Sequence, residues 1–443
     1  MLLGSASVVD AQYDLHPHKV VRVSPPSATL AVEVSIAINP TDKNNIVAGA
    51  IMRGYAKSKV PNYTWHSIDG GNTWGIRPTE NPDDRTQGDD VVVFSEDGTA
   101  IHGYISFKGI WGGKPKKTAT GIFIDRSTDK GETWSPQVPV VNHINTPTPM
   151  EDKPWFVFDR NKKSPHFGNL YCSWTRFDVY GSKDAQDTTQ IVFSRSVDDG
   201  KSFQPVIRIS DQGGDCVDGD DTVEGATPSC GPDGTLYCVW SGPRGLEMDL
   251  SKDGGETWGK DKVIGKQVGG WANDVEGIGR SNGMPVTAVD HSDGLGRGTL
   301  YVNFVDERNG DKDVFLMKSA DGGKTWSEPL QVNETQSAKK RDQFFTWLAV
   351  DPSDGSVNIV YYDRELTAAT GTRVTLSRST DQGKTFSHYR VGDVEFECTD
   401  GPFFGDYIGI DALDGRVALA FMHFVDKKKT AVSSAVFDFG GKR

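Results

Sequence analysis

The sequence predicts an all-β fold assembled from repeated four-stranded sheets, and three observations support this prediction. An eight-residue pattern, Ser-x-Asp-x-Gly-x-Thr/Ser-Trp/Phe, occurs six times, with successive starts 60, 69, 55, 68 and 60 residues apart. A pair of apolar segments joined by a turn occurs seven times. No long segment has the apolar periodicity of a helix, whereas 50 glycines and 22 prolines are typical of many tight turns. Self-similarity at this period indicates a repeat architecture.

The eight-residue pattern has the chemistry of a stapled hairpin. Its Asp can accept hydrogen bonds from nearby backbone N–H groups and so fold a tight turn. Its Gly supplies a position of positive φ that other residues resist. The final Trp or Phe can pack between neighbouring sheets, so we interpret the pattern as structural and not as the active site. The six copies are Ser67–Trp74, Ser127–Trp134, Ser196–Phe203, Ser251–Trp258, Ser319–Trp326 and Ser379–Phe386.

This pattern resembles the Asp-box, or bacterial neuraminidase repeat, of sialidases and related carbohydrate-active β-propellers. The resemblance covers residues 18–438, which we expect to form one propeller domain. It implies a carbohydrate-active protein, and because Asp-box propellers are commonly exported, it implies a secreted or periplasmic location. Residues 1–17 are typical of a trimmed leader or signal peptide, and residues 439–443 are expected to form a short tail.

The paired apolar segments give the number of blades. The last unit has a third strand, Thr430–Phe437, but no fourth, and His18–Ser24 resembles the fourth strand at Gln204–Ser210. We therefore predict seven blades closed by the N-terminal strand, with six as the alternative, since sialidases of this superfamily have six. Closure leaves no free sheet edge, so a monomer is expected. The seven units are Val32–Met52, Asp89–Phe107, Lys153–Phe177, Glu224–Gly242, Met284–Asp306, Gln343–Asp363 and Gly405–Phe424.

Composition excludes several classes of partner. A net charge of −13 and a pI near 5.2 argue against nucleic-acid binding. The sequence has no run of 18 apolar residues, so no membrane-spanning helix is expected. Of five cysteines, Cys216 and Cys230 can pair, whereas Cys172 and Cys238 occupy matching buried strands, and no spacing suggests zinc. No cofactor is expected to be required. The acidic loop 211–224 is either a structural calcium site or simply solvated.

In a propeller, the starts of first strands and the ends of second strands share one face, and the Asp-boxes lie on the opposite face. First-strand starts are charged here, with Glu33, Glu151, Asp152, Lys153 and Asp406 among them. Second-strand ends carry cations in six units, including Lys108, and the seventh has His423. The candidate catalytic residues are Asp89, Asp90, Glu224, Asp342 and Tyr407, and the candidate substrate-binding residues are Arg53, Arg176, Arg244, Arg308, Arg341, Arg364 and His423.

These residue types indicate chemistry on an anionic glycan. Arginine forks bind carboxylate and sulfate groups, so a ring of arginines favours a sialic acid, a uronic acid or a sulfated sugar. The alternative is that each arginine pairs with a neighbouring acid and holds the blades together. Two carboxylates can divide the work of glycosidic cleavage, and a Tyr paired with a carboxylate can serve as the nucleophile, as in sialidases. The leading hypothesis is a sialidase-like glycoside hydrolase.

Two other functions stay open. A Tyr or His near an Arg can abstract a proton from a uronate, which is the reaction of a polysaccharide lyase. The propeller can also be a non-catalytic module that binds a glycan or a protein. Sialidases carry a Phe/Tyr-Arg-Ile-Pro motif that is absent here, and the nearest text, Val21–Ser24, falls in the predicted closing strand. The arginine triad of sialidases therefore has no residue-by-residue counterpart.

Overall fold

A computed structural model describes residues 16, 18–53, 62–81, 85–107, 120–143, 146, 148–335, 341–367 and 370–440. The predicted leader falls almost wholly outside the described residues, as does Lys108. Every regular element of the described residues is a β-strand. No helix in this part of the chain could cross a membrane.

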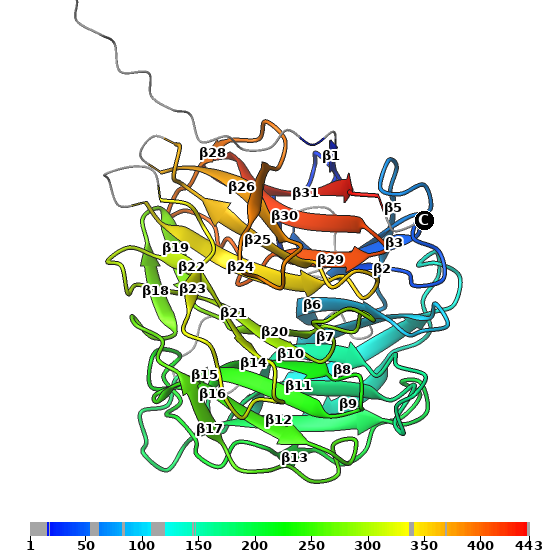
Figure 1. The fold of residues 1–443 in the computed structure, drawn as a ribbon, viewed down its shortest axis with the longest axis vertical. Helices are drawn as coiled ribbons and strands as arrows, with labels where there is room; N and C mark the ends of the chain where they lie inside the picture. The colour runs from blue at the N-terminus through cyan, green and yellow to red at the C-terminus, as the bar shows by residue number, and fades with distance from the viewer. Residues whose placement is uncertain are drawn as a thin grey trace, which may run out of the picture.

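Seven antiparallel four-stranded sheets form the blades of a propeller, with the blue first blade beside the red last blade and the green blades on the far side (Figure 1). The prediction of seven blades is confirmed, and the six-blade alternative is wrong. The first six blades are β2–β5 (Leu30–Ile38, Ile46–Arg53, Asn62–Ser67, Gly75–Pro78), β6–β9 (Thr86–Phe94, Ala100–Phe107, Thr120–Ser127, Val138–Asn142), β10–β13 (Met150–Phe158, Leu170–Phe177, Thr189–Ser196, Ile207–Arg208), β14–β17 (Glu224–Cys230, Leu236–Gly242, Gly245–Ser251, Lys262–Gly265), β20–β23 (Val286–Val289, Leu300–Asp306, Asp313–Ser319, Leu330–Gln331) and β24–β27 (Gln343–Val350, Val357–Asp363, Gly371–Ser379, Ser387–Arg390).

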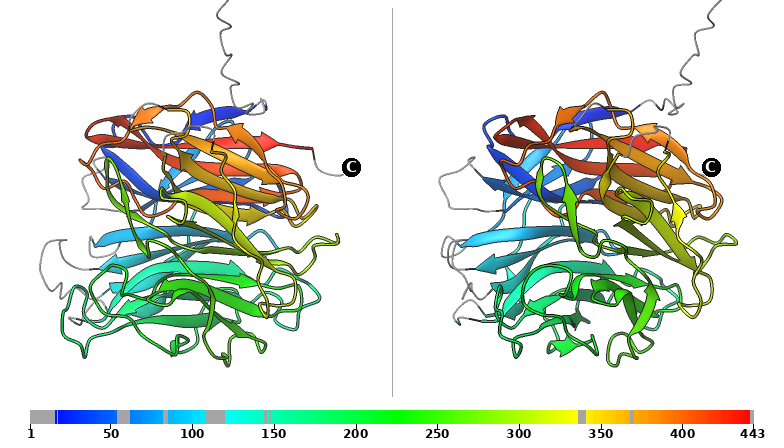
Figure 2. Two further views of the ribbon diagram at one scale, coloured as in Figure 1. Left: turned by 60° about the vertical axis from the view of Figure 1, so that its left-hand side comes forward. Right: turned by 90° about the vertical axis from the view of Figure 1, so that its left-hand side faces the viewer.

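The seventh blade joins the two ends of the chain. It contains β29 (Gly409–Leu413), β30 (Arg416–Asp426) and β31 (Lys429–Asp438), and its outer strand is β1 (Lys19–Arg22). Val20 lies opposite Ala435 in an antiparallel register. The first and last strands of the chain therefore lie side by side in one sheet, as both views of Figure 2 show in blue and red.

Two short elements lie outside the blade repeat, and the repeat pattern did not predict them. A hairpin of β18 (Ala272–Val275) and β19 (Ile278–Asn282) separates the fourth and fifth blades, and β28 (Phe396–Glu397) pairs with β26. Arg364 Nη2 donates a hydrogen bond of 2.7 Å to the Glu276 carbonyl at the hairpin turn. Asn282 Nδ2 donates one of 3.1 Å to the Asp406 carbonyl, so the hairpin is fixed against the sixth and seventh blades.

The Asp-box turns are held by a repeated set of hydrogen bonds. In the fourth blade, Ser251 Oγ donates to Asp253 Oδ1 over 2.7 Å and accepts the Gly255 N–H over 2.9 Å. Asp253 accepts the Thr257 N–H over 2.9 Å and the Thr257 hydroxyl over 2.5 Å. Trp258 packs edge-on against a buried Phe ring of the third blade, 5.0 Å between centroids. The turn therefore staples its own hairpin and also packs on the neighbouring blade.

The innermost strand of five blades carries a β-bulge near its start, where one residue adopts a left-handed backbone. Bulges bend a strand and re-aim its side chains, and such strained residues concentrate at functional sites. The left-handed residues and their φ angles are Glu33 (55°), Asp89 (54°), Lys153 (52°), Gly225 (70°) and Phe345 (44°).

The cysteines form no disulfide. All five are free and buried, so the possible pairing of Cys216 with Cys230 is wrong. Cys216 packs with Met150 and Phe177, whereas Cys230 belongs to a separate cluster in the core between the third and fourth blades. Cys172 and Cys238 are buried in β11 and β15, as their matching sequence contexts predicted.

Candidate functional site

A cavity of about 290 Å³ opens on the face where the innermost strands begin. Four carboxylates line it, and all come from the starts of innermost strands or the segment just before one. Arg53, Arg280 and Tyr180 add polar groups, and Phe107 and Phe403 supply apolar wall. The four carboxylates are those of Glu33, Asp89, Asp152 and Asp406.

Lys153 is the centre of a buried charge cluster beside this cavity. Its Nζ lies 2.8 Å from Asp152 Oδ2 and 3.5 Å from both Glu224 Oε2 and Asp406 Oδ2. The lysine side chain is 3% exposed, and the ring of Trp271 lies 5.8 Å from the ammonium. Burial lowers the pKa of Lys153, but the three carboxylates outweigh it and hold the pKa well above its ordinary value. The lysine therefore remains charged, and its ammonium bridges carboxylates from three blades.

Arg280, from the inserted hairpin, reaches into the same cluster. Its Nε donates to Asp406 Oδ1 over 3.1 Å, its Nη2 bonds Asp406 Oδ2, and its Nη1 lies 3.4 Å from Asp218 Oδ2. The guanidinium lies over the Phe403 ring, 5.2 Å from its centroid. Burial lowers the pKa of Arg280, but the charges of Asp406 and Asp218 raise it further. The side chain is still 36% exposed, so one edge of the fork faces the cavity.

Tyr180 and Asp218 form a short hydrogen-bonded pair at the edge of this cluster. The Tyr180 hydroxyl donates to Asp218 Oδ2 over 2.6 Å. Burial raises the pKa of Asp218, but the charges of Lys153 and Arg280 reverse the effect and lower it to about 2. Burial and the charge of Asp218 raise the pKa of Tyr180. At neutral pH the pair is therefore a protonated phenol bonded to an ionised carboxylate.

Glu33 and Asp89 form a second pair with the opposite electrostatics. The Asp89 N–H donates to Glu33 Oε2 over 3.2 Å, and the Lys153 N–H donates to Asp89 Oδ2 over 2.8 Å. Burial, with the charge of Asp406, raises the pKa of Glu33 to about 7. Burial and the charges of Glu33 and Asp152 raise the pKa of Asp89. Because neighbouring carboxylates resist double ionisation, this pair holds a proton near neutral pH.

An aromatic layer lies next to the charged strand starts, since Trp155 and Tyr407 follow Lys153 and Asp406 closely in the chain. The rings of Trp155 and Trp347 are 4.2 Å apart, and Tyr407 packs against them at 5.6 and 5.8 Å. The Tyr407 hydroxyl donates to the Asp90 carbonyl over 3.3 Å, and the ring is fully buried. None of these three rings lines the carboxylate-lined cavity.

The candidate catalytic residues occupy different places. Asp89 lines the cavity, and Glu224 lies 3.5 Å from Lys153 in the adjoining charge cluster. Asp90 turns away and bonds His102 Nε2 over 2.7 Å inside the second blade. Asp342 accepts the Lys312 N–H over 3.2 Å, and Tyr407 belongs to the aromatic layer. The structure therefore brings together Asp89 and Glu224 but not the other three.

The candidate arginines do not form a ring around the cavity. Arg53 alone of this set lines it, and within the described residues its guanidinium makes no ion pair, with a buried Nε lacking a hydrogen-bond partner. The others are held within or between blades. Arg176 bonds Glu151 (2.6 Å), Arg244 bonds Glu247, Arg308 bonds Asp306, Arg364 bonds Thr372 (3.0 Å), the Arg341 N–H bonds Asp311 (2.7 Å) and His423 Nε2 lies 3.0 Å from Ser433 Oγ.

Three residues of the site were not among the sequence candidates: Arg280, Tyr180 and Asp218. Arg280 lies in a glycine-rich insertion, whose departure from the blade repeat was the available signal. Asp218 belongs to the acidic loop 211–224. Glu224 of this loop also joins the Lys153 cluster, whereas Asp211 bonds Lys260 over 2.8 Å and Asp220 accepts the Ala272 N–H. Across the described residues, no three His, Cys, Asp or Glu side chains are grouped to hold a metal ion.

Comparison with known proteins establishes the fold. No protein-family model and no curated protein sequence matches the chain. Among solved structures, the Hadza microbial sialidase Hz136 is 15% identical over 88% of this chain and 76% of its own, with a TM-score of 0.50. The α-L-arabinanase of Penicillium chrysogenum, complexed with arabinobiose, is 15% identical over 83% and 99%, with a TM-score of 0.51. The Trypanosoma rangeli sialidase is 12% identical over 83% and 60%, with a TM-score of 0.50. The chain therefore has a propeller fold like that of these glycoside hydrolases.

Proposed function

We propose that this protein is a glycoside hydrolase that cleaves a glycan carrying an anionic group, with the carboxylate-lined cavity as its active site. The observation that supports this proposal is the separation of two carboxyl pKa values within one charge cluster. Glu33 has a pKa of about 7 and Asp218 has a pKa of about 2. Two carboxyl groups whose environments drive their pKa values apart are suited to be an acid and its ionised counterpart.

Glu33 is the proposed general acid. It lines the cavity, and it is largely protonated below pH 7 because burial and Asp406 disfavour its charge. It would donate its proton to the glycosidic oxygen as the bond to the anomeric carbon breaks, and it would then act as the base for the incoming water.

Tyr180 is the proposed nucleophile. Its oxygen would attack the anomeric carbon while its proton passes to Asp218, to which it is already bonded over 2.6 Å. Water would then cleave the glycosyl–tyrosine bond, and the proton on Asp218 would return to the phenol. An uncharged tyrosine oxygen suits a sugar with a carboxylate next to the anomeric centre, because it avoids the repulsion that a carboxylate nucleophile would meet.

Arg53 is the proposed partner of the anionic group. It lines the cavity without an ion-pair partner among the described residues, whereas Arg280 already bonds Asp406 and Asp218. An unpaired guanidinium can bind a carboxylate or sulfate through two parallel hydrogen bonds. Phe107 and Phe403 can pack against the sugar ring.

The test is a panel of sialylated, uronate-containing and sulfated glycans, scored by released reducing ends or free sialic acid. Glu33→Gln and Tyr180→Phe should each lower kcat by about a hundredfold or more. The matched controls are Glu397→Gln, whose carboxylate bonds Thr370 on the exterior, and Tyr389→Phe in the outer strand of the sixth blade. Arg53→Met should weaken turnover of the acidic substrate chiefly through KM. Equal rates in the wild type, Glu33→Gln and Tyr180→Phe would refute the proposal.

A lyase is the second candidate, because a tyrosine and two arginines line one cavity. In that reaction Tyr180 would remove the C5 proton of a uronate, Arg53 would neutralise its carboxylate, and Glu33 would protonate the leaving oxygen. Elimination creates an unsaturated sugar that absorbs ultraviolet light, whereas hydrolysis does not. Rising absorbance with the same panel would identify the lyase. Binding of a glycan without product by either readout would identify a recognition module.

A further inference from the structure

A second, larger cavity occupies the opposite end of the central channel. Its volume is about 490 Å³, which lies within the range of small-molecule sites, and residues of all seven blades line it. It opens on the Asp-box face, since turns at its rim contact Asp-box turns: Asp42, between β2 and β3, is 2.7 Å from the Asp-box residue Lys130. Trp155 and Trp347 line it, and it shares no lining residue with the carboxylate-lined cavity.

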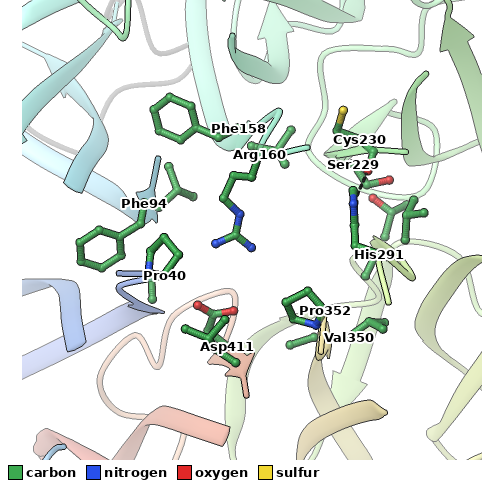
Figure 3. A pocket seen from close by; sticks show the side chains of 18 of the residues that line it. Pro40, Phe94, Phe158, Arg160, Ser229, Cys230, His291, Val350, Pro352 and Asp411 are labelled. Carbon is green, nitrogen blue, oxygen red and sulfur yellow. Dashed lines mark hydrogen bonds between the residues drawn. The ribbon is translucent and has the colours of Figure 1, made fainter. Parts of the chain in front are cut away.

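Arg160 projects into the middle of this cavity from the turn after β10 (Figure 3). No described residue lies within hydrogen-bonding or ion-pairing distance of its guanidinium, unlike the arginines that tie the blades together on the other face. A half-buried guanidinium without a partner has lost part of its hydration and gained no bond in return. A bound anion would supply that bond.

The Asp411 carboxylate, which faces Arg160, already accepts two backbone N–H groups, one from the first blade and one from its own blade. Asp411 lies across the cavity in Figure 3, and its two oxygens accept the Ile38 N–H and the Ala412 N–H, each over 2.8 Å. Burial raises the pKa of Asp411, while the more distant charge of Arg160 lowers it. The two side chains therefore interact through space without forming an ion pair, and a gap between them remains for a ligand.

The rest of the wall sets the shape and polarity of the ligand. Pro40, Phe94, Phe158 and Pro352 surround the guanidinium with apolar surface (Figure 3). On another side, His291 Nε2 lies 2.7 Å from the Cys230 carbonyl, so this nitrogen carries the proton and Nδ1 is left as an acceptor. The ligand that fits has one anionic head, an apolar or ring-shaped body and at most a few hydroxyl groups.

We infer that the cavity at the Asp-box end of the channel is a binding site for a small carboxylate, with Arg160 holding the carboxylate group and the ring of Pro40, Phe94, Phe158 and Pro352 packing against its body. This site is separate from the proposed active site, and it takes either the acidic sugar of a glycan or a free organic acid. The chemistry that recognises both is the same: a bidentate guanidinium–carboxylate pair in an apolar surround.

Calorimetric titration of the full chain with sodium glucuronate and with sodium benzoate tests this inference. Trp155 and Trp347 line the cavity, so tryptophan fluorescence gives a second readout. Arg160→Met keeps the aliphatic stem and removes the fork, and it should weaken binding by about tenfold or more. Arg160→Lys keeps the charge and should give an intermediate affinity. If Arg160→Met does not fold, as judged by its unfolding transition, Arg160→Lys carries the test.

Both titrations are made in an Arg53→Met background, because Arg53 lines the cavity on the other face and is itself proposed to bind an anionic group. Binding that falls when Arg160→Met is added to this background supports the site, with benzoate binding indicating a general organic acid and glucuronate binding alone indicating an acidic sugar. Binding that is unchanged when Arg160→Met is added, or no binding of either probe, overturns the inference. Because glycan turnover depends on Glu33 and Tyr180, failure here leaves the proposed hydrolase intact, and the reverse also holds.

Discussion

Replacing Lys153 with Met should destabilise the protein strongly, because it removes the cation at the centre of the buried cluster. Three carboxylate oxygens lie within 3.5 Å of its ammonium, and the side chain is 3% exposed. Removing one partner of a buried ion pair leaves an uncompensated charge and typically costs about 3–5 kcal/mol. We expect a loss in this range in the free energy of unfolding at pH 7. The loss should shrink at acidic pH, because burial raises the pKa of Glu224, which takes up a proton there and no longer needs the ammonium.

The assay is urea denaturation followed by tryptophan fluorescence, with Lys130→Met as the control. Lys130 also has a left-handed backbone, with φ of 67°, and it pairs with Asp42 over 2.7 Å, but its side chain is 50% exposed. A surface pair of this kind contributes less than about 1 kcal/mol. The two substitutions therefore match in residue type and backbone strain and differ in burial. Equal losses in the two variants would refute the electrostatic account of the cluster.

Three further predictions concern stability and pH. Glu33 has a folded pKa of about 7, which is above its unfolded value, so its proton stabilises the fold at acidic pH. This contribution to stability is lost as the pH rises to 7. In thermal melts, Glu33→Gln should therefore be more stable than the wild type at pH 8 and equal to it near pH 4. Burial lowers the pKa of His102, but the carboxylates of Asp125 and Asp90 outweigh it and raise the pKa to about 9. Stability should therefore fall between pH 6.5 and 9, and a His102→Gln variant in which this decline persists would contradict the assignment. Asp253→Ala should lower the free energy of unfolding in urea by about 1 kcal/mol through lost turn hydrogen bonds, whereas an unchanged midpoint would show that the Asp-box is not a staple.

The blade count could be predicted from the sequence because each blade repeats local chemistry. The turn hydrogen bonds of Ser251 and Asp253 join residues close in the chain, so the pattern that encodes them is visible without long-range information. The face of the site was also predictable. Glu33, Lys153 and Asp406 are charged residues at the starts of predicted first strands, so the sequence alone places them on this face.

The partners of those residues were not predictable, because they depend on register and on contacts between blades. Arg176 pairs with Glu151 because the two residues lie opposite each other in β10 and β11. Alternation alone cannot say whether Asp89 or Asp90 faces the cavity, because both lie in the bulge between Gly88 and Val91, where the register shifts. Arg280 reaches Asp406, 126 positions further along the chain, only because the hairpin folds across the propeller face.

The most direct test of the proposed site is the rate of glycan cleavage by the wild type and by Glu33→Gln, measured on the same substrates from pH 5 to pH 8. We predict release of sugar by the wild type that declines as the pH rises through about 7, where Glu33 loses its proton, and a fall of about a hundredfold or more in the variant. Cleavage by Glu33→Gln at the wild-type rate, with the same pH profile, would contradict the assignment of this cavity as the active site.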